Sequence, residues 1–190
     1  MIFGDFQWEM NKNSKEVGKF LSFILRHKPE KIGLTLDSEG WADIATLIAC
    51  AAKSGHALSR EVIQVVVDTN DKKRFTISED GSRIRAAQGH STASVTIQYQ
   101  EQKPPEFLYH GTATRFLDSI KEKGLLPGSR HHVHLSADEQ TAVAVGQRHG
   151  KPVVLKINAL LMYEQGVKFY LAENGVWLTN QVSSDFLIFD

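Results

Sequence analysis

The chain has 190 residues, of which 42% are hydrophobic, so it can bury a core as one large domain or two small lobes. It holds 22 lysines and arginines against 22 aspartates and glutamates, and its formal net charge is zero. Up to residue 105 there are 14 basic and 13 acidic residues, and beyond it 8 and 9. This balance excludes a polycationic nucleic-acid binder, so any nucleic-acid contact must be a local patch.

The cysteine content and the hydropathy of the chain indicate the cellular compartment in which the protein is expected. The one cysteine, Cys50, lies in an apolar run over residues 47–52 and is predicted to be a buried small hydrophobic residue. A disulfide within one chain is then impossible, which fits a reducing environment. No apolar run approaches the length of a membrane span, and the N-terminal residues lack a signal-peptide layout. We therefore expect a soluble, cytoplasmic protein.

The first half of the chain predicts helices. Apolar residues at helical spacing follow Ser14, an expected N-cap, and Pro29 disfavours helix beyond Arg26 and His27. Residues 32–36 alternate as a short strand would. Further helices are expected over residues 41–53, with Gly55 as the stop signal, and from Ser59 onward.

A basic hairpin is expected next. Two strand-like runs, 74–78 and 83–87, flank the turn sequence 79–82. Helices followed by a basic hairpin indicate a winged-helix-like arrangement, whose wing would carry Lys72, Lys73, Arg74, Arg83 and Arg85. We interpret Lys72 and Lys73 as solvated charges, whereas Arg74 shares a strand face with Thr76 and Ser78 that need not face solvent.

Residues 89–105 are polar, end in Lys-Pro-Pro and predict a linker. Beyond it, expected strands alternate with expected helices. Strands are expected at 107–112, 132–136, 153–157, 175–179 and 186–189, and helices at 116–123 and 136–150. We therefore expect an α+β fold, with a winged-helix-like lobe over residues 1–88 and a mixed lobe over 106–190.

Histidines and arginines are concentrated in the second half. Five of the eight histidines lie between His110 and His149, and the densest cluster, residues 130–136, contains no acidic residue. Hydrolytic sites normally need a carboxylate, a metal or a nucleophile–base pair, whereas arginine and histidine together suit phosphate binding. Zinc held by His110, His132 and His134 is an alternative, opposed by the lack of a carboxylate or thiol and by the neighbouring cation of Arg130.

Seven motifs occur in one order: Phe23–Pro29, Gly40–Trp41, Lys73–Phe75, Gln88–Ser91, Leu108–Thr112, Arg130–Ser136 and Asn174–Leu178. Together they resemble the RNA 2′-phosphotransferases, NAD-dependent enzymes that remove a splice-junction 2′-phosphate. The resemblance runs from about Ser14 to the C-terminus. It implies a winged-helix-like RNA-binding lobe followed by an ADP-ribosyltransferase-like lobe that binds NAD.

The resemblance also implies roles for individual residues. The family's catalytic set maps onto Arg26, His27, Arg74 and Arg130, and the NAD-binding positions onto His110, Gly111, Thr112, His132, His134, Ser136 and Val176. Val176 stands where many ADP-ribosyltransferases place a catalytic glutamate. Two alternatives stay open: Ser136 could instead cap a helix, and Arg26 could be a solvated cation favoured by the helix dipole. Ala87 and Ser183 depart from the family's usual Asn and Pro.

The implied reaction has two steps. The RNA 2′-phosphate attacks NAD and releases nicotinamide, and the resulting ADP-ribosylated RNA then yields a 2′-hydroxyl and ADP-ribose 1″,2″-cyclic phosphate. We expect NAD as co-substrate, no metal, a monomer, and an RNA partner for which tRNA is one candidate. Two other functions stay open: an ADP-ribosyltransferase acting on phosphorylated nucleic-acid ends, and a non-catalytic regulator that senses NAD or ADP-ribose.

Overall fold

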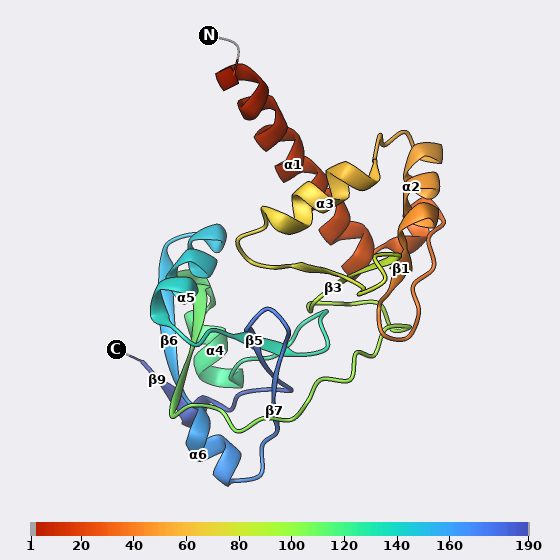
Figure 1. The fold of residues 1–190 in the computed structure, drawn as a ribbon. Coiled ribbons are helices and arrows are strands. Elements are labelled where there is room, and N and C mark those ends of the chain that lie inside the picture. Colours follow the sequence, from red (N-terminus) through yellow and green to blue (C-terminus); the bar gives the residue numbers. More distant parts are fainter. Residues whose placement is uncertain (1–2, 190) are drawn as a thin grey trace. The chain divides into compact units, whose positions relative to one another are not determined.

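The computed structural model describes residues 3–189, with side chains from Ser14 onward (Figure 1). The first two residues of the N-terminal stretch in which no signal peptide was expected lie outside this range. The chain divides into two compact units, one ending at Gln98 and the other beginning at Tyr99.

Helices form most of the first unit. They are α1 (Phe3–Arg26), the 3₁₀ turn η1 (Pro29–Ile32), α2 (Ile44–Lys53) and α3 (Arg60–Asp68). The carboxylate of Asp43 caps α2 and the hydroxyl of Ser59 caps α3, each accepting a backbone N–H three residues on. Ser14 does not cap α1, because the helix begins eleven residues earlier, at Phe3. Serine is only mildly unfavourable inside a helix, so it did not have to mark the start.

The expected strand at residues 32–36 is wrong, although its burial pattern is right. Ile32, Leu34 and Leu36 are buried while the residues between them are exposed, as a strand would give. Ile32 ends the turn η1 instead, and residues 33–36 belong to none of the strands in the described part of the chain. An extended segment over a core buries alternate side chains without needing a hydrogen-bonded partner.

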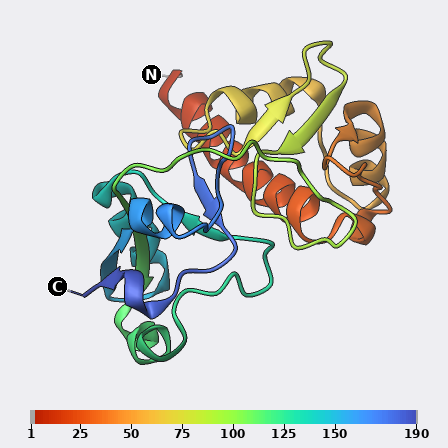
Figure 2. The same cartoon turned by 90° about the horizontal axis from the view of Figure 1, so that it is seen from below.

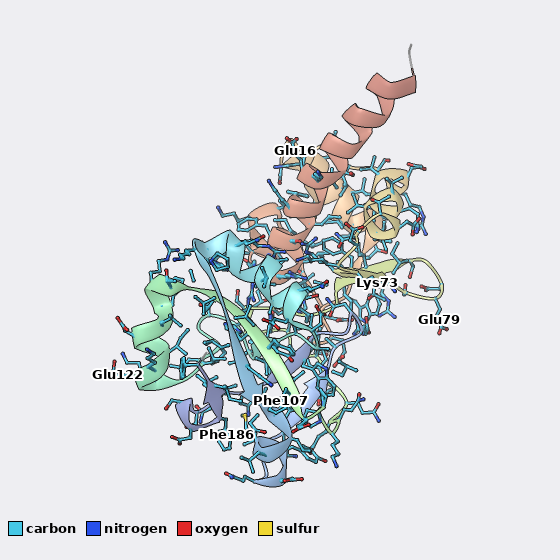
Figure 3. All side chains as sticks on the ribbon, turned by 90° about the vertical axis from the view of Figure 1, so that its left-hand side faces the viewer. Glu16, Lys73, Glu79, Phe107, Glu122 and Phe186 are labelled. Carbon is cyan, nitrogen blue, oxygen red and sulfur yellow. The ribbon has the colours of Figure 1, made fainter. Side chains whose placement is uncertain are left out.

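A three-stranded antiparallel sheet completes the first unit. It consists of β1 (Ala42–Asp43), β2 (Phe75–Ile77) and β3 (Arg83–Ala86) in the order β1-β3-β2. The predicted hairpin is confirmed, and its strands lie side by side in Figure 2. In the turn, which Figure 3 marks with Glu79, the hydroxyls of Ser78 and Ser82 hydrogen-bond to Asp80 and lower the pKa of that carboxyl.

The segment expected as a linker is shared between the units. Val95 is fully buried in the core of the first unit, together with Leu21, Ile24, Leu25, Leu47, Ile63 and Ile84. The amide of Thr96 donates to the carbonyl of Ser38. Further along, the amide of Gln102 donates to the carbonyl of Phe169 in the second unit. The polar composition of residues 89–105 therefore accompanies packed, hydrogen-bonded backbone.

Two antiparallel sheets form the second unit. One has the order β4-β6-β9, from β4 (Phe107–Ala113), β6 (Pro152–Asn158) and β9 (Leu187–Ile188). The other has the order β5-β8-β7, from β5 (Val133–Leu135), β7 (Phe169–Leu171) and β8 (Trp177–Thr179). Backbone hydrogen bonds in both directions between Tyr109 and Ser136 join β4 to the end of β5.

Short helices flank these sheets. They are α4 (Leu117–Lys123), α5 (Glu139–Gly146) and α6 (Ala159–Glu164), with 3₁₀ turns η2 (Thr114–Phe116), η3 (Gln147–His149) and η4 (Ser184–Phe186). Figure 3 marks α4 with Glu122 and the start of β4 with Phe107. The helix expected over residues 116–123 begins one residue later, at Leu117, and the side chain of Phe116 is 41% exposed.

Both units combine helices with small antiparallel sheets, so the fold is α+β, as the sequence indicated. The core of the second unit contains Leu108, Leu135, Leu155, Ile157, Phe169 and Trp177. Within the described part of the chain, no helix is long and apolar enough to cross a membrane.

Candidate active site

Arg26 and His27 lie at the C-terminal end of α1, where the following Pro29 prevents the helix from continuing. The side chain of Arg26 is not a solvated helix-end cation, because the residue is only 8% exposed. His27 is half-buried. A buried guanidinium is costly unless it binds something, which sets this arginine apart from the exposed basic residues of the unit.

The segment 91–92 holds this helix end in place. The amide of Ser91 donates to the carbonyl of Arg26 at 2.9 Å, and the hydroxyl of Thr92 donates to the same carbonyl at 3.3 Å. The Ser91 hydroxyl also hydrogen-bonds Nδ1 of His27 at 2.9 Å. The helix end thus has its last carbonyl satisfied and its imidazole oriented by one short segment.

Arg74 precedes β2 and is held by the turn before it. The carboxamide oxygen of Asn70 accepts from Nη1 of Arg74 at 3.2 Å and from its backbone amide at 3.4 Å. The carbonyl of Arg74 accepts from the amide of Ala87 at 2.9 Å. Ala87 thus contacts the backbone of Arg74, and Ser91 contacts the backbone of Arg26. Ala87 and Ser91 are four residues apart in the sequence, so at most ~14 Å of chain separates these two contacts.

The fourth predicted catalytic residue, Arg130, lies in the second unit. Its Nη1 is 2.9 Å from Nδ1 of His134, which is on β5. The carbonyl of His134 accepts from Nδ1 of His110, on β4, at 3.0 Å. One arginine and two histidines from three segments therefore form a continuous hydrogen-bonded chain.

These contacts assign the protonation of both rings. An arginine can only donate and a carbonyl can only accept, so Nδ1 of His134 is unprotonated and Nδ1 of His110 carries its proton. Burial lowers the pKa of His110 below its usual 6.5; the hydrogen bond to His134 opposes this, and the charges of His149 and Arg130 add to it. With Nδ1 assigned in this way, Nε2 of His134 is a donor, and Nε2 of His110 is an acceptor in the neutral ring, the form that the lowered pKa of His110 favours.

His132 has a different environment. Its ring makes edge contacts with Tyr99, at 5.9 Å between centroids, and with Tyr170, at 5.7 Å. Burial, with a smaller contribution from His131, lowers its pKa. His110, His132 and His134 thus turn to different partners, and no group of three His, Cys, Asp or Glu side chains able to hold a metal occurs among residues 14–189, whose side chains the structure describes.

Gly111 and Thr112 are explained by packing. A Cβ on Gly111 would overlap the carbonyl oxygen of Ala142 in α5, and one on Gly146 would come within 2.6 Å of the carbonyl oxygen of Thr112. The helix and the strand therefore touch backbone to backbone. Thr112 is buried. This close contact accounts for the two glycines without reference to a ligand.

The structure contradicts one of the two roles considered for Ser136, that of a helix cap. The N-cap of α5 is Asp138, whose carboxylate accepts from the amide of Thr141 at 2.7 Å. The helix was expected to begin at Ser136, but that residue pairs with Tyr109 instead. Val176 is half-buried, and its carbonyl accepts from the amide of Ala172 in the turn between β7 and β8.

Two residues of the candidate site were not among the sequence predictions. Asn70 holds Arg74, and Ser91 holds His27. Ser91 lies in the Gln88–Ser91 motif, so its place in a recognised motif could have indicated it from the sequence. Asn70 stands four residues before the arginine that it contacts, outside every motif, and the sequence carries no comparable signal for it.

Comparison with known proteins supplies a family for this geometry. The model of the "RNA 2′-phosphotransferase, Tpt1 / KptA family" matches residues 12–181. A protein of Pectobacterium carotovorum is 66% identical over 177 residues, covering 93% of this chain and 95% of its own. One of Pseudomonas fluorescens is 61% identical over 173 residues (91% and 95%), and one of Escherichia coli is 59% identical over 177 (93% and 96%). All three carry the name probable RNA 2′-phosphotransferase.

Proposed function

The chain belongs to the RNA 2′-phosphotransferase family, and we propose that it transfers an internal RNA 2′-phosphate to NAD. The products would be RNA with a 2′-hydroxyl, nicotinamide and ADP-ribose 1″,2″-cyclic phosphate. The observation that carries the proposal is the match over residues 12–181, which includes all the candidate site residues in both units. The three relatives support the transferase activity through their names.

We propose that Arg26, Arg74 and Arg130 bind the phosphate and that His27 transfers protons. A phosphate dianion is itself a nucleophile, so the first step needs no general base. In the second step a ribose hydroxyl attacks the phosphate, the RNA 2′-oxygen leaves, and charge spreads over the phosphoryl oxygens, where positioned guanidiniums are most effective. A histidine that titrates near neutral pH suits the proton movements of that step.

The first unit is proposed to be the RNA-binding lobe, with a winged-helix-like arrangement. Its helices and the β2–β3 hairpin support this assignment. Arg83 and Arg85 on the hairpin are both near the ring of Trp41, at 5.3 and 4.5 Å, and Arg85 also lies 3.7 Å from Glu39. These two arginines therefore stabilise the local structure through contacts with Trp41 and Glu39. We assign the RNA contacts to Arg26 and Arg74 instead.

The second unit is proposed to bind NAD, in an ADP-ribosyltransferase-like fold. The donor set suits this molecule: ribose hydroxyls need both acceptors and donors, and the Nε2 atoms of His110 and His134 are one of each. His132 and Ser136 are proposed as further contacts, together with the backbone at Gly111, Thr112 and Val176. When bound, NAD supplies the carbon that the phosphate attacks and the hydroxyl that later accepts it.

The test is incubation with an oligoribonucleotide that carries one internal 2′-phosphate, with and without NAD and with EDTA present. We expect a 2′-hydroxyl RNA and released nicotinamide only when NAD is present, and no loss of activity with EDTA, because arginines supply the positive charge. A stable ADP-ribosylated product would favour an ADP-ribosyltransferase, and NAD binding without turnover would favour a regulator. A requirement for added zinc or magnesium would contradict the metal-free proposal.

A further inference from the structure

We propose that His134 is a positioning residue for Arg130: its Nδ1 accepts a hydrogen bond from Nη1 of Arg130 and holds the guanidinium for the phosphate. The 2.9 Å contact between these atoms carries the inference. It rests on the proposed function, since Arg130 matters only if a phosphate is bound. It assigns the Nδ1 side of His134 a task distinct from the NAD contact proposed for the Nε2 side.

Arg130 needs such a partner because its own backbone restrains it little. The residue is exposed and lies on a bend that precedes β5, with its amide donating to the carbonyl of Pro127 at 3.2 Å. A long arginine side chain on such a segment samples many rotamers, and fixing it in one of them costs conformational entropy. A positioned acceptor reduces that cost before the substrate arrives.

His134 is suited to be that acceptor because its own position is fixed. It is the middle residue of β5, where it pairs with Leu178 of β8. Its neighbours Val133 and Leu135 are buried on the opposite face of the strand. Its carbonyl accepts from His110, so a change at the ring is not expected to move the strand. The acceptor therefore sits on a rigid element, and the flexible arginine is held against it.

Two substitutions separate the two sides of the imidazole. In His134→Asn, the side-chain oxygen can take the place of Nδ1, whereas in His134→Gln the amide nitrogen can take the place of Nε2. We expect His134→Asn to weaken NAD binding and, at saturating NAD, to slow the single-turnover rate of 2′-hydroxyl formation less than His134→Gln does. We expect His134→Gln to slow that rate roughly 10- to 100-fold, because a misplaced catalytic group costs this much.

The matched control is His131→Gln. His131 is exposed, lies three residues from His134 on the same segment and belongs to neither proposed set. It should behave as the wild type in both rate and NAD affinity. Equal losses for His134→Asn and His134→Gln, or a loss confined to NAD affinity in both, would overturn the positioning role. A wild type that fails to convert 2′-phosphorylated RNA would instead refute the proposed function.

A second readout does not depend on activity. Long-range proton–nitrogen NMR spectra distinguish an imidazole protonated at Nε2 from one protonated at Nδ1. In the substrate-free protein we expect His134 to be the Nε2–H form, with the Nδ1 resonance shifted in Arg130→Ala and unchanged in His131→Gln. An Nδ1-protonated His134, or a resonance indifferent to Arg130→Ala, would contradict the contact itself.

Discussion

Individual residues of the candidate site are restrained by side-chain contacts with residues from other parts of the chain. Ser91 contacts His27, Asn70 contacts Arg74, and His134 contacts Arg130. Each partner comes from a turn, a strand or an irregular segment rather than from the residue's own helix or strand. Sequence similarity could indicate the arginines and the histidine, because they lie in recognisable motifs. The restraining contacts depend on side-chain geometry and became visible only in the structure.

The contact between Ser91 and His27 gives the first prediction. Ser91→Ala removes the hydroxyl that orients the imidazole but keeps the amide that binds the Arg26 carbonyl. We expect the single-turnover rate to fall by up to ~100-fold, as for a catalytic group displaced by about an ångström. Ser91→Thr should restore most of the rate. Thr92→Val removes a bond to Arg26 but not to His27, and serves as the control. A wild-type rate for Ser91→Ala would show that the bond is incidental.

The environment of His110 predicts a pH dependence of stability. Burial lowers its folded-state pKa below the ordinary 6.5. The unfolded chain therefore takes up the proton first as the pH falls, so the stabilising contribution is complete above pH 6.5 and is lost as the pH falls toward the folded-state pKa. Urea unfolding at pH 7.5 and 5.5 should show a smaller loss of unfolding free energy for His110→Gln than for the wild type. Equal losses would mean that His110 is not the cause; His132 would be tested next in the same way.

At the scale of helices and strands, the sequence predicted the features that depend on a few neighbouring residues. The end of α1 before Pro29, the Ser59 cap and the β2–β3 hairpin were all predicted correctly, because proline, capping residues and turn sequences act over a few residues. The strand predicted at 32–36 was wrong because alternating apolar residues indicate which side chains are buried and do not show that the backbone pairs with another strand. The start of α5 was misplaced because Ser136 and Asp138 are both good caps, and the pairing of Ser136 with Tyr109 decided between them.

The backbone contact between β4 and α5 gives a prediction at this scale. Gly111→Ala would force a methyl group into the carbonyl of Ala142, and overpacking of this kind costs about 1–3 kcal/mol or more. Gly128→Ala, in the same unit, meets no atom within 4 Å and differs only by its positive φ of 65°, worth roughly 1–2 kcal/mol. Chemical denaturation should therefore show a larger loss for Gly111→Ala. A smaller loss there than at Gly128 would mean that the helix shifts freely and that packing does not require the glycine.

For the whole molecule, the sequence predicted two folded parts and assigned the catalytic set to both. Arg26, His27 and Arg74 belong to the first unit and Arg130 to the second. Composition predicted a linker at residues 89–105, but that segment includes Val95, which is fully buried, and Ser91, which contacts His27. The composition of a segment is an average, whereas the packing of that segment depends on a few individual residues. The family match over residues 12–181 is what unites the two sets in one proposed reaction.

The most direct test of the account follows one labelled RNA with an internal 2′-phosphate through both steps on a gel. We predict that Arg74→Ala and Arg130→Ala, one from each unit, slow the second step roughly 100- to 1,000-fold and accumulate a slower-migrating ADP-ribosylated RNA, since each removes a preorganised donor. His110→Ala should depress the first step and leave no such species. Arginine variants that stop with unreacted RNA and no slower-migrating species, or that match the wild type, would contradict this division of the reaction.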